Sequence, residues 1–523
     1  MDKNIDTELH QTLVDYAHDL CQEGALTDAV SLISKLAYLE GRDYIGYLSS
    51  IRLEVLLLKI AQKTFPNSNF KKKEKKERKV LHIGTEFYNI GGHTKVVLDW
   101  IENDIYSNSE ILLTNQQQQV LLPEGIPKHY LKGTSEIDKA VMLRDFLYKN
   151  YFDVIVLHQH MEDIVPTLAL WDIRKKTGSI VLFYNHANFR FSLGNIIADK
   201  RINFNSGDVV ISKKYRYPVN DYVLNFVLGE KKYKKPSSEV LIKYRQETGL
   251  EESKVIFFAI GSPYKYAPFE EQNFFAEWNQ FLSKNHHCTL IVVGSTEDDF
   301  RRFCPNLKKV DNLLLKGRVT KPIVYYQISD YIVDTYPLPA GLGTLDGLYY
   351  GLPPILSYQE NSVLLGKAVN KLYPDTIVNY LSYTNKQEYF EFIEEEIETK
   401  AYKKWASPII EKHIEDKFLL KPWQEQLEKI YAEPCKPIAP FDTTKDILNK
   451  SIPSQKWYKF TASPTRSFNL IILAFKHNIP FSFKLLAMYI CLIIKNKSLK
   501  RAGLRTFVSY LLGRYKRDNV KNG

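Results

Sequence analysis

Cysteine is scarce in this chain, and the cysteines that it has are far apart. The 523 residues include five, at positions with no paired spacing: Cys21, Cys288, Cys304, Cys435 and Cys491. A disulfide scaffold or a zinc site needs cysteines at short, paired intervals, so the sequence argues against both. This usage fits a reducing compartment. The first residues also lack the basic segment and apolar core of a secretion signal. We therefore expect a cytoplasmic protein.

The sequence also lacks an apolar run long enough to cross a membrane, which takes about 20 residues. The longer apolar run of the C-terminal segment, Leu485 to Ile494, has ten residues and lies between Lys484 and Lys495. A run of this length with lysines at both ends is typical of a helix that lies on a membrane surface.

Acidic residues are almost absent from the same C-terminal segment. From Lys456 to the end, fourteen lysines and arginines stand against one acid, Asp518, so this segment carries +13 while the whole chain carries +11. Alternating apolar and basic residues predict that 450–523 is a basic amphipathic tail bound to an anionic membrane surface. A helical subdomain with a basic outer face is the alternative. No recognised nucleic-acid-binding motif accompanies the charge, so we expect no nucleic-acid partner.

The length predicts three or four structural units. Residues 1–70 carry apolar positions at helical spacing and predict a helical cap, whose central helix-turn-helix joint resembles one tetratricopeptide unit. A charged linker, 71–79, follows. The segments 80–245 and 250–435 then alternate buried strands with helices, which predicts two α/β domains ahead of the tail.

The first α/β segment opens with a strand at Val80–Gly84, and a turn containing Gly91, Gly92 and His93 precedes a helix from Val96. Strand, glycine turn and helix are typical of a doubly wound sheet. Ligands of such sheets bind at the carboxyl ends of the strands.

Histidines follow two further strands of this segment. Asp153–Leu157 ends in His158-Gln-His160, and Ile180–Tyr184 ends in Asn185-His186-Ala187-Asn188. Histidine titrates near neutrality and can act as acid, base or phosphate partner. His158 and His160 alone do not make a metal site, because no third ligand has a suitable spacing, so we predict no metal.

The second α/β segment contains two glycine- and proline-rich turns after buried strands. One is Ser262-Pro263-Tyr264-Lys265, and the other contains Gly341 and Gly343 and opens a helix. Glycines at a helix start let backbone N–H groups approach an anion, and the helix dipole favours a phosphate there. Asp346, one turn into that helix, could accept hydrogen bonds from sugar or ribose hydroxyls.

Three segments, in order along the chain, resemble motifs of GT-B glycosyltransferases. The segment from Asn185 to Asp199 resembles that of bacterial enzymes that build surface glycans. Gly261 to Phe269 (Gly-Ser-x-x-Lys-x-x-Pro-Phe) resembles the turn that sets a lysine on the donor diphosphate. Asp334 to Pro354 resembles the nucleotide-sugar loop of the O-GlcNAc-transferase-like family. It is also similar to the Glu-x7-Glu segment of retaining GT-B enzymes, with Asp346 at the second glutamate and Leu338 at the first.

The resemblance implies an α/β protein of the GT-B fold. Two facing Rossmann-like domains would stand between the helical cap and the basic helical tail. It implies a glycosyltransferase that uses a nucleotide sugar, expected to be a UDP-sugar, and needs neither a metal nor another cofactor.

Roles for individual residues follow from the same resemblance. His186 and His93 would act near the reacting carbon. The donor would be bound by Lys265, Ser262, Gly341, Gly343, Thr344, Asp346 and Arg318. The acceptor side would contain Gly91, Gly92, His158 and Asn188.

Three readings of the biological role remain open. The basic tail favours a lipid-linked or surface-polysaccharide acceptor at the cytoplasmic face of the membrane. The O-GlcNAc-transferase-like loop and the helical cap favour a protein acceptor instead. Leu338 and Asn188, where the families have acids, leave open an inactive scaffold subunit. Retention or inversion of the anomeric centre also stays open.

Overall fold

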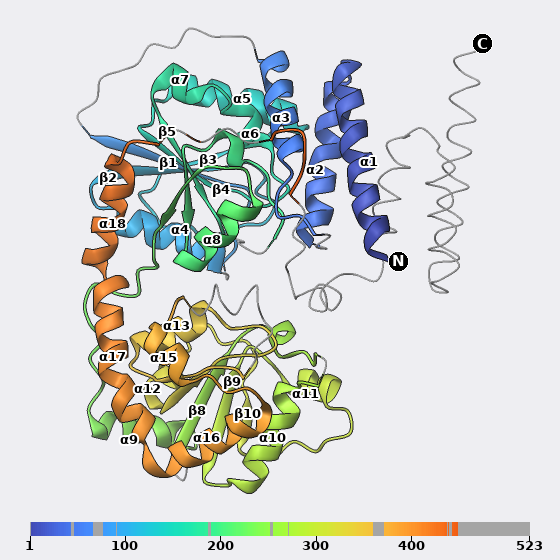
Figure 1. Ribbon diagram of the computed structural model, residues 1–523. Coiled ribbons are helices and arrows are strands. Elements are labelled where there is room, and N and C mark those ends of the chain that lie inside the picture. The colour runs from blue at the N-terminus through green and yellow to red at the C-terminus, as the bar shows by residue number, and fades with distance from the viewer. Residues whose placement is uncertain are drawn as a thin grey trace.

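The computed structural model describes residues 2–42, 46–65, 77–89, 92–186, 190–250, 255–269, 271–358, 371–436, 438 and 442–447. Within these residues the chain folds into two α/β domains, with helices beside the first domain and further helices running from the second domain back to the first (Figure 1). The predicted tail, 450–523, lies outside the described residues, as do Gly91 and Asn188.

The first domain contains a sheet whose seven described strands are all parallel, in the order β3-β2-β1-β4-β5-β6-β7. The strands are β1 (Arg78–Gly84), β2 (Ser107–Leu113), β3 (Lys128–Tyr130), β4 (Val154–His158), β5 (Ile180–Tyr184), β6 (Lys200–Asn203) and β7 (Asn220–Val223). The helices are α4 (Gly92–Asn103), α5 (Glu136–Lys149), α6 (Val165–Ala169), α7 (Ile173–Thr177), α8 (Ser206–Tyr215) and the 3-10 turn η1 (Asn195–Ile197).

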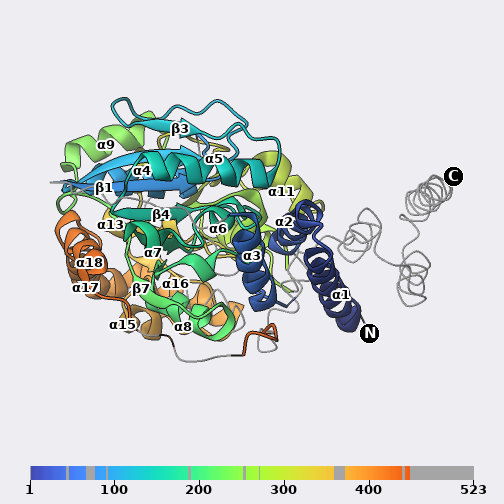
Figure 2. The same cartoon turned by 90° about the horizontal axis from the view of Figure 1, so that it is seen from above.

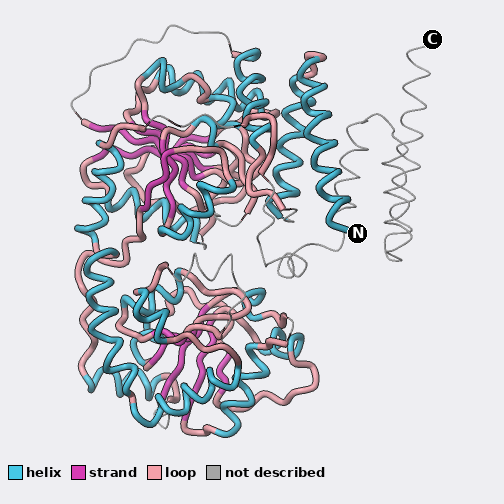
Figure 3. The backbone as a smooth tube through the Cα atoms, in the orientation of Figure 1, coloured by secondary structure: helices cyan, strands magenta, loops and turns pink. Residues whose placement is uncertain are grey.

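The second domain repeats this design with a smaller sheet. Its described strands are also parallel and lie in the order β10-β9-β8-β11-β12. They are β8 (Val255–Ile260), β9 (Cys288–Val293), β10 (Leu313–Leu315), β11 (Tyr331–Val333) and β12 (Pro354–Ile355). The helices are α9 (Ser238–Glu247), η2 (Pro263–Tyr266), α10 (Phe274–Lys284), α11 (Glu297–Phe303), α12 (Ile323–Ile328), α13 (Leu342–Tyr349), α15 (Asp375–Tyr380) and α16 (Lys386–Thr399). Figure 3 shows the two sheets as separate bodies.

The predicted cap consists of three described helices, α1 (Asp2–Gln22), α2 (Leu26–Arg42) and α3 (Ile51–Thr64). Side chains alternate across a strand, so Leu81 and Ile83 of β1 face the same side of the sheet. Both are buried in one apolar core with cap residues such as Leu36 and Leu57. The cap is therefore an integral layer of the first domain.

The opposite face of the same sheet is covered by α4 and by the last described helix. The helices α17 (Ala401–Lys417) and α18 (Leu420–Ala432) lead from the second domain to the first, on the side away from the cap in both views (Figures 1 and 2). Trp423 of α18 is buried with Val80 of β1 and Trp100 of α4. The two consecutive helices α17 and α18 therefore connect the second domain to the first.

Candidate active site

The carboxyl ends of the two sheets face each other where the domains meet. In the first domain this edge bears the residues after β1, β4 and β5, and in the second domain the residues after β8 and β11. The starts of α4 and α13 approach closely, since a Cβ added at Gly92 would lie 3.4 Å from Cδ1 of Leu342. Ligands of open α/β sheets bind at such edges, so a reactive site is expected here.

A row of three histidines runs from the interior of the first domain to this edge. Nδ1 of His82 lies 3.0 Å from Nε2 of His158, and Nδ1 of His158 lies 2.9 Å from Nε2 of His186. His82 and His158 are fully buried, whereas His186 is half-buried. His93, at the start of α4, donates from Nε2 to the backbone oxygen of His158 at 2.8 Å, and its ring centroid lies 4.2 Å from that of His186.

These histidines are neutral at physiological pH. Burial lowers the pKa of His82 to about 3 and, with the charge of His160, that of His93 to about 4. Burial and the neighbouring histidines lower the pKa of His158 and of His186 well below the ordinary value. A neutral imidazole has one N–H donor and one bare nitrogen, so each ring can donate and accept at once.

His160 differs from this group. Burial lowers its pKa, but the hydrogen bond and charge of Glu162 outweigh that effect and raise it overall. Its ring is stacked on Tyr88, with centroids 6.1 Å apart. The ring of His160 also lies 5.4 Å from that of His93, between centroids, so it adjoins the row without belonging to it.

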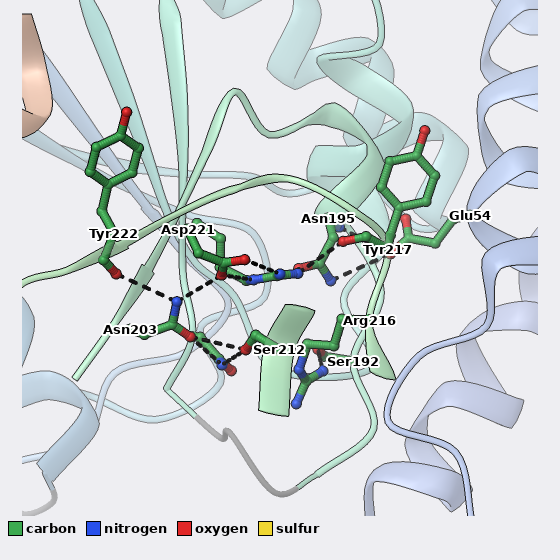
Figure 4. Close-up of polar contacts among 11 residues, drawn as sticks. Glu54, Ser192, Asn195, Asn203, Ser212, Arg216, Tyr217, Asp221 and Tyr222 are labelled. Atoms are coloured by element: carbon green, nitrogen blue, oxygen red, sulfur yellow. Dashed lines mark hydrogen bonds and ion pairs between the residues drawn. The ribbon is translucent and has the colours of Figure 1, made fainter. Parts of the chain in front are cut away.

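The segment that carries His186 is held by an extensive polar network (Figure 4). The amide of Asn185 donates to Oδ1 of Asn203 at 3.1 Å and to Oγ of Ser212 at 3.2 Å. Arg216 donates to Oγ of Ser192 at 2.6 Å, and it also donates to the backbone oxygen of Leu48 beside the cap. These bonds fix the backbone on both sides of His186.

The cap contributes directly to this network through Glu54 of α3. Its carboxylate accepts hydrogen bonds from the backbone N–H groups of Gly194 and Asn195 at 3.1 and 3.0 Å, and from that of Ile196 at 3.4 Å. Burial raises the pKa of Glu54 to about 7, although these hydrogen bonds oppose the shift. The cap therefore holds the loop that follows His186.

In the second domain, Asp334 organises the loop after β11. Its buried carboxylate accepts from the backbone N–H of Thr335 at 2.9 Å, from that of Ala340 at 2.7 Å and from the hydroxyl of Thr344 at 3.1 Å. Thr344 is itself fully buried, so its side chain supports the loop from within.

Lys265 closes the other side of this loop. Its ammonium group donates to the backbone oxygens of Pro339 and Ala340, at 3.0 Å each. Burial lowers its pKa, and the charge of Asp334 opposes that shift. The loop thus brings a cation to the start of α13.

The start of α13 has the geometry of an anion site. Gly341, the residue before the helix, has a φ of 67°, in the region that favours glycine, and no side-chain cap bonds to this helix end within the described residues. A Cβ at Gly343 would lie 2.6 Å from Cγ2 of Ile260, so only glycine lets the helix approach β8 so closely. Helix N–H groups and the ammonium of Lys265 together suit a diphosphate.

The remaining predicted donor residues lie at the edges of this site. Burial raises the pKa of Asp346 to about 6. The charge of Lys95 of α4 opposes this shift and that of Asp99 of α4 adds to it, so charges of the first domain act on this carboxyl. Ser262 is exposed immediately before η2. Arg318 is exposed in the turn after β10. The described part of the chain contains no group of three or more histidine, cysteine, aspartate or glutamate side chains placed to hold a metal ion.

Two features of the site were missed by sequence reasoning. His82 is a single histidine inside a buried strand. A titratable ring among apolar neighbours was the signal that could have identified it as part of the site. In the second domain, Asp334 directly follows the buried strand β11, and its role in the loop follows only from its partners in space.

No protein-family model matches this chain, and no curated protein matches it by sequence. Among solved structures, it is similar to a glycosyltransferase from Rickettsia africae, with 14% identity and a TM-score of 0.52, over 68% of this chain and 98% of that one. It is also similar to Anabaena HepE in complex with UDP and glucose, with 13% identity and a TM-score of 0.51, over 68% of this chain and all of that one.

An O-GlcNAc transferase from Thermobaculum terrenum matches more of the chain, 89%, but at a TM-score of only 0.41 and 12% identity, over 81% of that protein. The two better-superposed structures have the same pair of parallel α/β domains as this protein. The predicted architecture is confirmed: the described chain has the fold of the GT-B glycosyltransferases.

Proposed function

We propose that the protein is a glycosyltransferase that moves a sugar from a UDP-sugar to an acceptor bound between the two domains. The observation that carries this proposal is the pairing of an anion site in one domain with a row of neutral histidines in the other. Lys265 and the start of α13 form the anion site. The two lie on facing sheet edges, where the fold binds its ligands.

The donor diphosphate would take the place of the backbone oxygens that now accept from Lys265. Its negative charge would meet the ammonium group and the N–H groups at the start of α13, which supports departure of the nucleotide without a metal ion. Asp346 would accept from a ribose or sugar hydroxyl. His186 and His93 would lie beside the reacting sugar, where neutral imidazoles can donate or accept a proton.

The experiment is a panel of nucleotide sugars tested for thermal stabilisation and slow hydrolysis with wild type, Lys265→Ala and a control, Lys284→Ala. Lys284 is exposed at the end of α10, away from the loop. We expect one donor to stabilise and be hydrolysed by wild type and the control, and loss of both effects in Lys265→Ala. If a folded wild-type protein responds to no donor, the scaffold reading replaces this proposal.

For the acceptor, we propose a lipid-linked or surface glycan at the inner face of the cell membrane. The basic, apolar composition of 450–523 supports this proposal. No helix in the described part of the chain is long and apolar enough to span a bilayer. Deletion of 450–523 should release the protein from anionic vesicles while donor hydrolysis continues. Unchanged vesicle binding after deletion would contradict the proposal and favour the protein acceptor.

A further inference from the structure

The histidine row has a direction, because a neutral imidazole that donates from one nitrogen must accept at the other. In one direction every ring carries its proton on Nδ1: His82 donates to His158, and His158 donates to His186. In the opposite direction every ring carries its proton on Nε2. In both directions Nε2 of His186 is bonded to His158, so its outer nitrogen is Nδ1. The first direction makes this atom an N–H donor, and the second leaves it a bare acceptor.

The inner end of the row decides between them. Nε2 of His82 is buried and has no hydrogen-bond partner among the described residues. His82 is fully buried on the sheet face that it shares with Val80, and the ring of Trp100 packs against it with centroids 5.8 Å apart. A buried N–H without an acceptor is a rarer and costlier defect than a bare acceptor nitrogen. The proton of His82 therefore belongs on Nδ1.

We propose that His82 and His158 are positioning residues that set the tautomer of His186, so that it presents an Nδ1–H donor to the substrate. Nε2 of His186 is occupied by the bond from His158 at 2.9 Å. No hydrogen bond to its Nδ1 is found within the described ranges, so this N–H is available. The role toward substrate rests on the proposed glycosyl transfer, but the tautomer itself does not.

His93 has the complementary polarity. Its Nε2 lies 2.8 Å from the backbone oxygen of His158, and an oxygen can only accept, so the proton of His93 is on Nε2. Its Nδ1 is buried and, among the described residues, without a partner. The two neighbouring rings at the sheet edge thus have opposite polarity, with an N–H at Nδ1 of His186 and a bare, buried Nδ1 in His93.

The direct test is nitrogen-15 NMR of the full-length protein labelled in its histidine rings, at neutral pH and without substrate. Two-bond couplings between ring protons and nitrogens distinguish the neutral tautomers. We expect His82, His158 and His186 to be protonated on Nδ1 and His93 on Nε2. Protonation of His186 on Nε2 would overturn the inference. This outcome does not depend on whether the protein proves to be a transferase.

A matched pair of variants tests the consequence for turnover. In His82→Asn the amide can still donate to Nε2 of His158, whereas in His82→Asp the carboxylate can only accept and reverses the row. We expect His82→Asn to keep kcat within about twofold, and His82→Asp to lower kcat about tenfold with little change in KM, the effect of one lost hydrogen bond. His186 should change tautomer only in His82→Asp.

The proposal would be contradicted if both variants lost kcat equally at equal thermal stability and the tautomer of His186 did not change. His82 would then be a packing residue only. If His82→Asp does not fold, the NMR measurement on the wild type still decides.

Discussion

Histidine serves opposite purposes at two places in this chain. In the row from His82 to His186, burial without a carboxylate partner keeps the rings neutral. His10 of α1 is equally buried, but it lies between two carboxylates. Its Nδ1 contacts Glu40, and its Nε2 lies 3.2 Å from Asp446. Their charges and hydrogen bonds outweigh the effect of burial and raise the pKa of His10 to about 9.

This shift makes the stability of the cap depend on pH. Because the folded pKa of His10 lies above its ordinary value of 6.5, its contribution is complete below pH 6.5 and is lost as the pH rises through about 9. We expect the difference in free energy of unfolding between wild type and His10→Gln to shrink by about 3 kcal/mol over this range. Denaturation curves at pH 6.5 and 9 measure it. An equal difference at both pH values would refute the charged state.

The sequence predicted that His93, His158 and His186 lie at one sheet edge, because each follows a strand of the same predicted sheet. In the structure these residues are in contact. The sequence could not identify their hydrogen-bonding order, because His82 lies 76 positions from His158 in the chain. It likewise placed Thr344 in the donor loop, but the inward direction of its side chain depends on Asp334. The functional roles of these residues stay predictions.

At the scale of elements, α3 connects the cap to the loop after His186. The sequence predicted a helical cap and identified one helix pair within it. The structure has a third helix, α3, and this helix carries Glu54. A glutamate in an amphipathic helix is ordinarily exposed. Here it is buried because three backbone N–H groups of the 194–196 turn meet it.

Replacing Glu54 tests this connection. Glu54→Ala would leave buried N–H groups without an acceptor, so we expect a loss of roughly 1–3 kcal/mol in the free energy of unfolding and a lower kcat with the donor site intact. The control is Glu398→Ala, at an exposed position of α16, which should change neither. Normal stability and turnover in Glu54→Ala would show that the cap does not support the loop.

At the scale of the whole molecule, the two α/β domains are joined by helices that return from the second to the first. The structure shows how the crossing is held: Trp423 and Leu427 of α18 are buried against the sheet face that α4 also covers. Arg78 of β1 adds an ion pair with Glu428.

The last described residues return to the far side of the first domain. Asp446 accepts from the hydroxyl of Ser50 at 2.9 Å and from the backbone N–H of Arg52 at 3.0 Å, in addition to contacting His10. The described segment 442–447 is thereby bound to the cap. No composition or spacing in the sequence pointed to this contact.

The sequence by itself determined the order of strands, glycine turns and helices, because each depends on residues within a few positions of one another. It also confined the positive charge to one segment. Only the tertiary structure decided which side chains meet across long separations, such as His10 and Asp446, 436 positions apart. The physical reason is that a buried polar group is defined by its partners, and those partners are chosen by packing rather than by local pattern.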